Sequence, residues 1–206
     1  MRVTARTLAV ALTVGALLAG CHKGSTGEAV VKAPEMSLGD PAAKVTVIEY
    51  ASDTCPHCAK FGADVFPAFK AKYVDTGKVR YVFREFLTPP TNIAAAGFLL
   101  ARCAGKDNYF KVVDAEFRAQ ERIYQTGDVH GVLGEIGKSV GLSQAQVDAC
   151  IQDPAALAAL QERVDKAADQ DHITGTPTLI VNGKTLAVGE VTLADLDGAI
   201  QPLLAH

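Results

Sequence analysis

The run VTVIEYASDTCPHCAKF, residues 45–61, places a short apolar segment directly before two cysteines, Cys55 and Cys58. Its first part lies in KVTVIEYAS, residues 44–52, which is rich in β-branched residues and predicts a strand buried on both faces. Glu49 lies inside this strand, where a carboxylate is costly unless it has a partner or a purpose. On its own, the cysteine pair can bind zinc, staple a loop or exchange electrons with other thiols.

A helix is expected to begin near the cysteines. Asp53 or Thr54 can cap it, and Pro56 is tolerated in its first turn. Further along, Pro67 is expected to kink it. Its apolar face consists of residues that recur every four positions: Phe61, Val65 and Phe69.

The position of Cys55 at the start of this helix favours its thiolate, which is the nucleophilic form. Free N–H groups and the positive end of the helix dipole both stabilise negative charge there. A protonated or hydrogen-bonding His57 adds to this effect. Cys58 lies one turn further on and can attack a mixed disulfide formed at Cys55, so the spacing supplies both a nucleophile and a resolving thiol.

The remainder of the chain predicts an α/β fold. GKVRYVFREF at 77–86 predicts a second strand, and residues 93–173 are mostly helical. The segment 176–188 predicts a hairpin that turns at Asn182-Gly183, and a final helix is capped by Thr192. The order of strand, helix, strand, helical block, hairpin and helix indicates a layered sheet with a helical insertion in one connection.

The first 20 residues have the form of an export signal. Two arginines precede the apolar run TLAVALTVGALLAG, which is too short for a comfortable membrane span. The run ends in Leu18-Ala19-Gly20-Cys21, which resembles the bacterial lipobox and implies cleavage before Cys21 and lipidation of its thiol. The alternative is an ordinary secretory signal that happens to precede a cysteine. Residues 21–38 are interpreted as the lipidated cysteine and a flexible tether.

The chain has five cysteines, and lipidation of Cys21 leaves four. Disulfides persist outside the cytoplasm, so two pairs are the simplest accounting. We expect Cys103 and Cys150 to form a structural disulfide, with a second redox relay as the alternative. A structural zinc site needs four ligands, and the sequence has no second CxxC or HxxxH motif, so no metal is expected at Cys55 and Cys58.

Together, VTVIEYASDTCPHCAKF, the GTPT motif at 175–178 and the helical block between them resemble the DsbA-like thiol:disulfide oxidoreductases. The resemblance covers roughly residues 38–206 and implies a thioredoxin-like fold in residues 39–206 with a helical insertion at about 91–172. By this resemblance, Cys55 is the exposed nucleophile, Cys58 the buried resolving thiol and Glu49 a buried acid that handles protons. Pro177 matches the cis-proline whose loop faces the cysteines and, with Thr176, holds substrate main chain.

The resemblance and the lipobox together imply an exported, lipid-anchored dithiol oxidase that faces the periplasm or the cell exterior. Residues 22–40 cannot supply the N-terminal dimerisation domain on which the related isomerases are built, which favours a monomer. The oxidase would donate the Cys55–Cys58 disulfide to reduced exported proteins, need no other cofactor, and be reoxidised by a membrane partner resembling DsbB. Thr176 departs from the valine of the best-known oxidases. It favours the alternative of an isomerase or reductase with a DsbD-like donor. A metal-binding lipoprotein without turnover is a further alternative.

Composition narrows the range of expected partners. The chain has 49% hydrophobic and 21% charged residues and a formal net charge of −3, which is ordinary for a globular protein. It has no basic block and no stretch rich in arginine and aromatic residues, so nucleic acid is not an expected partner.

Overall fold

The computed structural model describes residues 34–205, which contain one five-stranded sheet with the order β1-β3-β2-β4-β5. Strand β2 is central; it runs parallel to β3 and antiparallel to β4. The remaining neighbours, β1 with β3 and β4 with β5, are antiparallel. The strands are β1 (Met36–Leu38), β2 (Val45–Ala51), β3 (Val79–Glu85), β4 (Thr178–Val181) and β5 (Lys184–Val188).

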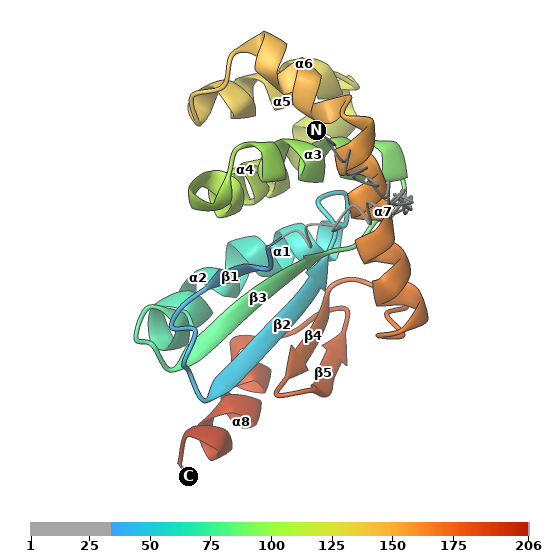
Figure 1. Ribbon diagram of the computed structural model, residues 1–206. Helices are drawn as coiled ribbons and strands as arrows, with labels where there is room; N and C mark the ends of the chain where they lie inside the picture. Colours follow the sequence, from blue (N-terminus) through green and yellow to red (C-terminus); the bar gives the residue numbers. More distant parts are fainter. Residues whose placement is uncertain (1–33, 206) are drawn as a thin grey trace, which may run out of the picture. The chain divides into compact units, whose positions relative to one another are not determined.

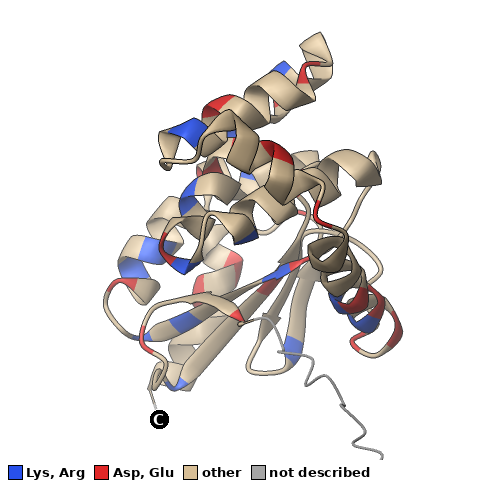
Figure 2. Cartoon of the chain, turned by 45° about the horizontal axis from the view of Figure 1, so that its top comes forward, with Lys and Arg blue, Asp and Glu red and all other residues tan. Residues whose placement is uncertain are grey.

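The helices between β3 and β4 form the helical insertion of a thioredoxin-like fold, and Figure 1 shows α3–α6 gathered together beyond α1. Acidic and basic residues are interspersed along the helices and strands (Figure 2). The helices are α1 (Pro56–Asp64), α2 (Phe66–Phe69), α3 (Thr91–Cys103), α4 (Lys106–Thr126), α5 (Val129–Ser139), α6 (Gln144–Ile151), α7 (Pro154–Asp169) and α8 (Leu193–Leu204), with a π-helical turn at Lys70–Val74.

The alternating side chains of β2 separate the two faces of the sheet. Val47 belongs to the large core that includes residues of α1 and α8. Tyr50 packs with Ala167 of α7 on the other face. Glu49 has the same parity as Val47, so it points to the face covered by α1.

Several local predictions are confirmed. The helix after the cysteines is interrupted, since α1 ends at Asp64 and Pro67 lies in the short α2. Thr192 caps α8 with a capping box. The hairpin turns at Asn182-Gly183, where both residues have positive φ angles of 44° and 79°.

The interpretation of residues 21–38 as tether is wrong at its end. Met36–Leu38 forms edge strand β1, with Met36 opposite Phe83 of β3, and Met36 is buried. Three residues are too few to show a period in sequence. The predicted signal peptide at 1–20, Cys21 and the tether up to residue 33 lie outside the described residues. Within the described chain, no helix has the length and apolar character needed to cross a membrane.

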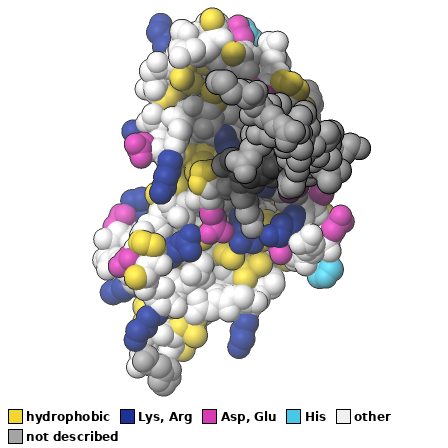
Figure 3. All heavy atoms as spheres, viewed as in Figure 1, with side chains coloured by type: hydrophobic (Ala, Val, Ile, Leu, Met, Phe, Trp, Pro, Cys, Tyr) yellow, Lys and Arg dark blue, Asp and Glu magenta, His cyan; other side chains and the backbone are white. Residues whose placement is uncertain are grey.

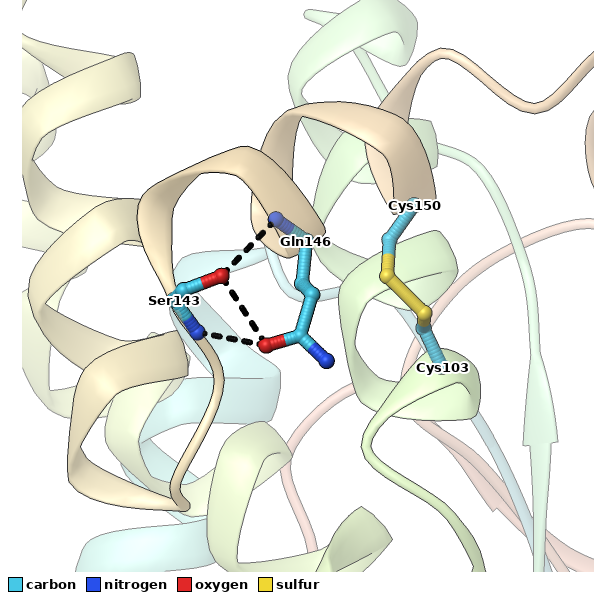
Figure 4. The surroundings of a disulfide bond; sticks show 4 residues. All are labelled: Cys103, Ser143, Gln146 and Cys150. Atoms are coloured by element: carbon cyan, nitrogen blue, oxygen red, sulfur yellow. Dashed lines mark hydrogen bonds between the residues drawn. A yellow bond between two sulfur atoms is a disulfide. The ribbon is translucent and has the colours of Figure 1, made fainter.

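Cys103 at the end of α3 and Cys150 in α6 form a disulfide, with Cα atoms 5.9 Å apart. Figure 4 shows it beside the capping box at the start of α6, where Ser143 donates its N–H to Gln146 Oε1 and accepts the N–H of Gln146. The bond closes a loop of 46 residues, which in the chain-entropy model stabilises the fold by ~4 kcal/mol.

Glu85, at the end of β3, is buried and joins three helices to the sheet. Its carboxylate accepts hydrogen bonds from Arg102 of α3, Arg163 of α7 and Tyr109 of α4 at 2.5–3.0 Å. Burial opposes ionisation of Glu85, but the two guanidinium groups more than offset it and hold its pKa below the ordinary value. Interior charge is thus compensated where the insertion meets β3.

We expect Cys103–Cys150 to remain paired after mild reductant has opened Cys55–Cys58, because folding stabilises this bond by as much as the bond stabilises the fold. Alkylation followed by mass mapping at graded reductant concentrations measures this order. Free Cys103 or Cys150 in otherwise oxidised protein would contradict a structural role.

Glu85→Gln is expected to lower the free energy of unfolding by about 3 kcal/mol at neutral pH, because Arg102 and Arg163 lose their shared countercharge. Because the folded-state pKa of Glu85 is depressed, its contribution is present above the unfolded pKa and is lost as pH falls through the folded value. The difference between variant and wild type should therefore shrink in acid. Glu135→Gln, in the exposed pair with Arg122, is the control, and an equal loss there would contradict the account.

Candidate active site

Cys55 is the N-cap residue of α1. Its Sγ accepts the backbone N–H of Cys58 at 3.3 Å. Neither Asp53 nor Thr54 takes this place, contrary to the sequence prediction. The hydroxyl of Thr54 instead donates to the carbonyl oxygen of Thr88 at 2.9 Å, and Asp53 is turned into the interior. The sulfur itself therefore receives the stabilisation that a helix N-terminus offers to an anion.

The two thiols are not bonded to each other, and they differ strongly in acidity. A hydrogen bond from the Cys58 thiol, together with the backbone N–H groups of Cys58 and His57, lowers the pKa of Cys55 to about 6 despite partial burial. Burial, the same hydrogen bond and the charge of Glu49 raise the pKa of Cys58 well above its ordinary value. One cysteine is thus a stable thiolate and the other a stable thiol.

Both cysteines are buried, and Cys55 is only slightly more accessible to solvent than Cys58. Cys55, expected to be exposed, is 6% exposed, and Cys58 is 0% exposed. Pro56 and His57 are exposed between them. The His57 Nδ1 lies 3.5 Å from Glu190 Oε1, so the imidazole contacts this carboxylate. The backbone N–H of His57 interacts with Cys55 and helps to lower its pKa.

The loop before β4 lies directly against the reactive sulfur, as the resemblance implies. The peptide bond between Thr176 and Pro177 is cis. The Cys55 Sγ lies 3.3 Å from the carbonyl oxygen of Thr176, to which it donates when it is protonated. Thr176 therefore meets the sulfur although it is 121 residues away in sequence.

Glu49 is 2% exposed and lies in the central strand β2. It is therefore not a solvated carboxylate on an edge strand. Its Oε2 accepts the hydroxyl of Tyr81 at 2.5 Å, and its Oε1 has no partner among the described residues. Burial raises the pKa of Glu49 to about 8; the Tyr81 hydrogen bond opposes this rise and the charge of Cys55 adds to it. The carboxyl can therefore gain or lose a proton near neutral pH.

A cavity of about 640 Å³ reaches Glu49 from the surface. Residues of β1, α1, α2, β3 and α4 line it, six of them are aromatic, and Lys106 and Lys111 are among its charged residues. Figure 3 shows hydrophobic side chains in a hollow between the sheet and the helices, with charged side chains nearby. This cavity gives the buried carboxyl a route for proton exchange with solvent.

Helix α4 fastens the loop that carries Cys55, a feature that the sequence reasoning missed. Gln120 Nε2 donates to the carbonyl oxygen of Asp53 at 2.7 Å, and the Tyr124 hydroxyl donates to that of Thr54 at 2.6 Å. Glu116 lies one turn before Gln120 and is buried near the same loop. The only available sequence signal was a spacing of four residues between these polar side chains.

Within residues 34–205, no group of three or more His, Cys, Asp or Glu side chains is arranged to hold a metal ion. Cys103 and Cys150 are engaged with each other and contribute no ligand to the Cys55–Cys58 pair. The arrangement of the site is suited to thiol exchange.

Comparison with known proteins supports this chemistry. Residues 32–202 match the protein family described as Thioredoxin. A putative protein-disulfide oxidoreductase of Rickettsia bellii is 32% identical over 171 residues, which are 81% of this chain and 65% of that protein. Disulfide bond formation protein D of Bacillus subtilis is 26% identical over 151 residues, which are 72% of this chain and 68% of that protein. The chain thus spans somewhat less than two thirds of the length of the rickettsial relative.

Among solved structures, alpha-DsbA1 of Wolbachia pipientis is similar with a TM-score of 0.76 and 29% identity, over 83% of this chain and 91% of that one. BdbD of Bacillus subtilis has a TM-score of 0.74 at 22% identity and shares the fold. Both similarities extend through the helical insertion as well as the sheet, since each covers more than four fifths of this chain.

Cys58→Ala is expected to raise the pKa of Cys55 by about 1–2 units above its value near 6, because the strongest donor to the thiolate is lost. Cys58→Ser retains an O–H donor and should leave a smaller shift. The rate of Cys55 alkylation by iodoacetamide as a function of pH measures both. Identical midpoints for wild type and Cys58→Ala would contradict this assignment.

Proposed function

The chain belongs to the thioredoxin family, in its DsbA-like branch, and from this premise we propose that it is an extracytoplasmic thiol:disulfide oxidoreductase that donates the Cys55–Cys58 disulfide to exported proteins. One observation carries the proposal: Cys55 caps α1 beside the Thr176–Pro177 loop, with Cys58 buried behind it. A nucleophile, a resolving thiol and a loop that can hold substrate thus meet at one point.

The reaction begins with Cys55 and Cys58 joined. A substrate thiolate attacks Cys55 Sγ, the bond to Cys58 breaks, and the Cys58 sulfur leaves as a thiolate that takes up a proton. A second substrate thiolate attacks the substrate sulfur of this mixed disulfide and displaces the Cys55 thiolate. The substrate loses two electrons and gains a disulfide, and the enzyme is left with one thiolate and one thiol.

The direction of electron flow follows from the stability of the reduced pair. A pKa of about 6 keeps Cys55 mostly ionised at neutral pH, which makes it a good leaving group and stabilises the dithiol form. A disulfide whose reduced form is stabilised is a strong oxidant. This asymmetry supports an oxidase over an isomerase or a reductase.

Glu49 is the proton donor for the departing Cys58 sulfur in this proposal. Its pKa of about 8 leaves it protonated at neutral pH, and its carboxyl interacts electrostatically with both cysteines. Glu49 then regains a proton from solvent through the cavity that it lines. Without such a donor, the Cys58 thiolate would stay charged in an apolar interior.

Substrate main chain binds along the loop before β4. Pro177 is buried, and Val188 at the end of β5 lies close to Gly175 of this loop and presents an apolar side chain that is 55% exposed. Unfolded substrates present apolar segments that fit such a surface. Thr176, which stands where the best-known oxidases carry valine, is the feature that favours the second candidate, an isomerase or reductase with a DsbD-like donor.

The partners and location complete the proposal. A membrane protein of the DsbB type reoxidises the Cys55–Cys58 pair. The name of the Bacillus subtilis relative, disulfide bond formation protein D, is consistent with an oxidising role. The lipobox at Cys21 would anchor a monomeric enzyme to a bacterial membrane facing the periplasm or the cell exterior.

Two measurements test the function. Purified oxidised protein should restore the disulfides of a reduced, unfolded substrate, and Cys55→Ser should abolish this activity. Thiol alkylation in cells should find Cys55–Cys58 mostly oxidised. A mostly reduced pair would favour the isomerase or reductase, and full activity of Cys55→Ser would exclude both enzyme hypotheses.

A further inference from the structure

Asp53 and Glu116 form a buried cluster of carboxyls that the reaction does not use. Asp53 is 6% exposed and Glu116 is 2% exposed. Asp53 Oδ1 and both carboxylate oxygens of Glu116 accept no hydrogen bond from any described residue. Buried acceptors without donors are rare in native proteins, so this cluster calls for a physical explanation.

The two carboxyls meet over Gly97 of α3. A Cβ atom built on Gly97 would overlap Asp53 Oδ2 and would lie 3.2 Å from Glu116 Cδ. The absence of a side chain at Gly97 therefore leaves the space in which both groups fit. The adjoining cavity has a volume of only about 10 Å³, which is room for no more than one water molecule.

Among residues 34–205, no cation faces the pair. Helix α3 contributes Ile93 and Gly97, and α5 contributes Leu133. The titratable groups that interact with the pair are Tyr109 and Tyr124 of α4, and Cys55 lies near the Asp53 side of this cluster. Glu85, by contrast, is buried with two guanidinium groups. Two carboxylates without a cation would repel strongly in such an interior.

We propose that Asp53 and Glu116 hold one proton between them in the folded protein, and that this shared proton fastens the loop carrying Cys55 to α4. The proton supplies one donor to a pair whose three unpartnered oxygens otherwise have none. It completes a row of three ties, because Gln120 and Tyr124 bind the carbonyl oxygens of Asp53 and Thr54 from the same face of α4. Asp53 and Glu116 are positioning residues, and their effect on catalysis rests on the proposed function.

The pH dependence has a definite sign. Burial raises the pKa of both carboxyls well above the ordinary value, and the charge of Asp53 adds to this for Glu116. The folded protein therefore keeps a proton that the unfolded chain releases. Stability from this source is full below the unfolded pKa and falls as pH rises, by about tenfold in the folding equilibrium constant per pH unit for each retained proton.

Infrared spectroscopy of the folded protein detects the proton directly through the C=O stretching band of a protonated carboxylic acid. The Glu49→Gln background removes the other carboxyl whose pKa is raised, and ordinary carboxyls are ionised at pH 8. The band should be present at pH 8 in Glu49→Gln and absent when Asp53→Asn and Glu116→Gln are added. A Glu49→Gln protein without the band would overturn the proposal, whether or not the triple variant folds.

Urea unfolding of reduced protein between pH 5 and pH 9 measures the linkage. Wild type should lose stability relative to Asp53→Asn/Glu116→Gln as pH rises, because only wild type must release the shared proton. Glu121→Gln, on the exposed side of the same helix, is the matched control and should run parallel to wild type. A difference between wild type and double variant that stays constant over this range would overturn the proposal.

The positioning role has its own readout. Glu116→Leu removes the tie and should raise the pKa of Cys55, measured by alkylation, by at least about half a unit, whereas Glu116→Gln retains a donor and should preserve it. Equal values in Glu116→Leu and wild type would contradict positioning. If the infrared band is present but wild type has no oxidase activity, the proposed function is refuted and the shared proton is not. If the band is missing but wild type is fully active, the shared proton is refuted and the proposed function is not.

Discussion

The hydrogen bond from the Cys58 N–H to Cys55 Sγ is the interaction around which the rest of the structure is organised. It exists because central strand β2 ends just before Cys55 and α1 begins directly after it. The sulfur therefore replaces the oxygen that usually caps a helix, and it does so as an anion. Moving the start of α1 by one residue would separate the thiolate from the donors that stabilise it.

Much of the remaining fold keeps this junction in place. The loop that carries Cys55 is held by Thr88 on one side and by Gln120 and Tyr124 of α4 on the other. The cis-proline loop meets the sulfur from the opposite end of the sequence. The insertion is thus more than an appendage to the sheet, because α4 contributes hydrogen bonds to the loop of the active site.

The sequence was sufficient wherever the cause was local. The apolar run at 44–52, the Asn182-Gly183 turn and the N-cap at Thr192 depend on neighbouring residues, and each was found as predicted. The thioredoxin-like class, with its helical insertion, came from the resemblance in the CPHC and GTPT motifs, and the structure agrees with it.

The sequence failed where the cause was distant. Asp53 is a good capping residue by type, but its carboxyl is turned toward Glu116, 63 positions later, and Cys55 takes the cap. Strand β1 forms because β3 offers it an open edge, which three residues alone cannot reveal. The two arginines at Glu85 come from α3 and α7, so their shared site appears only in the folded chain.

The reduction potential of Cys55–Cys58 tests the central claim most directly, since the claim is that donors around Cys55 stabilise the reduced pair. Equilibration with glutathione buffers at pH 7 measures it, with Cys103–Cys150 left intact. The account predicts a value less negative than about −230 mV, in the range of proteins that donate disulfides. A value near −270 mV, typical of thioredoxin, would contradict it.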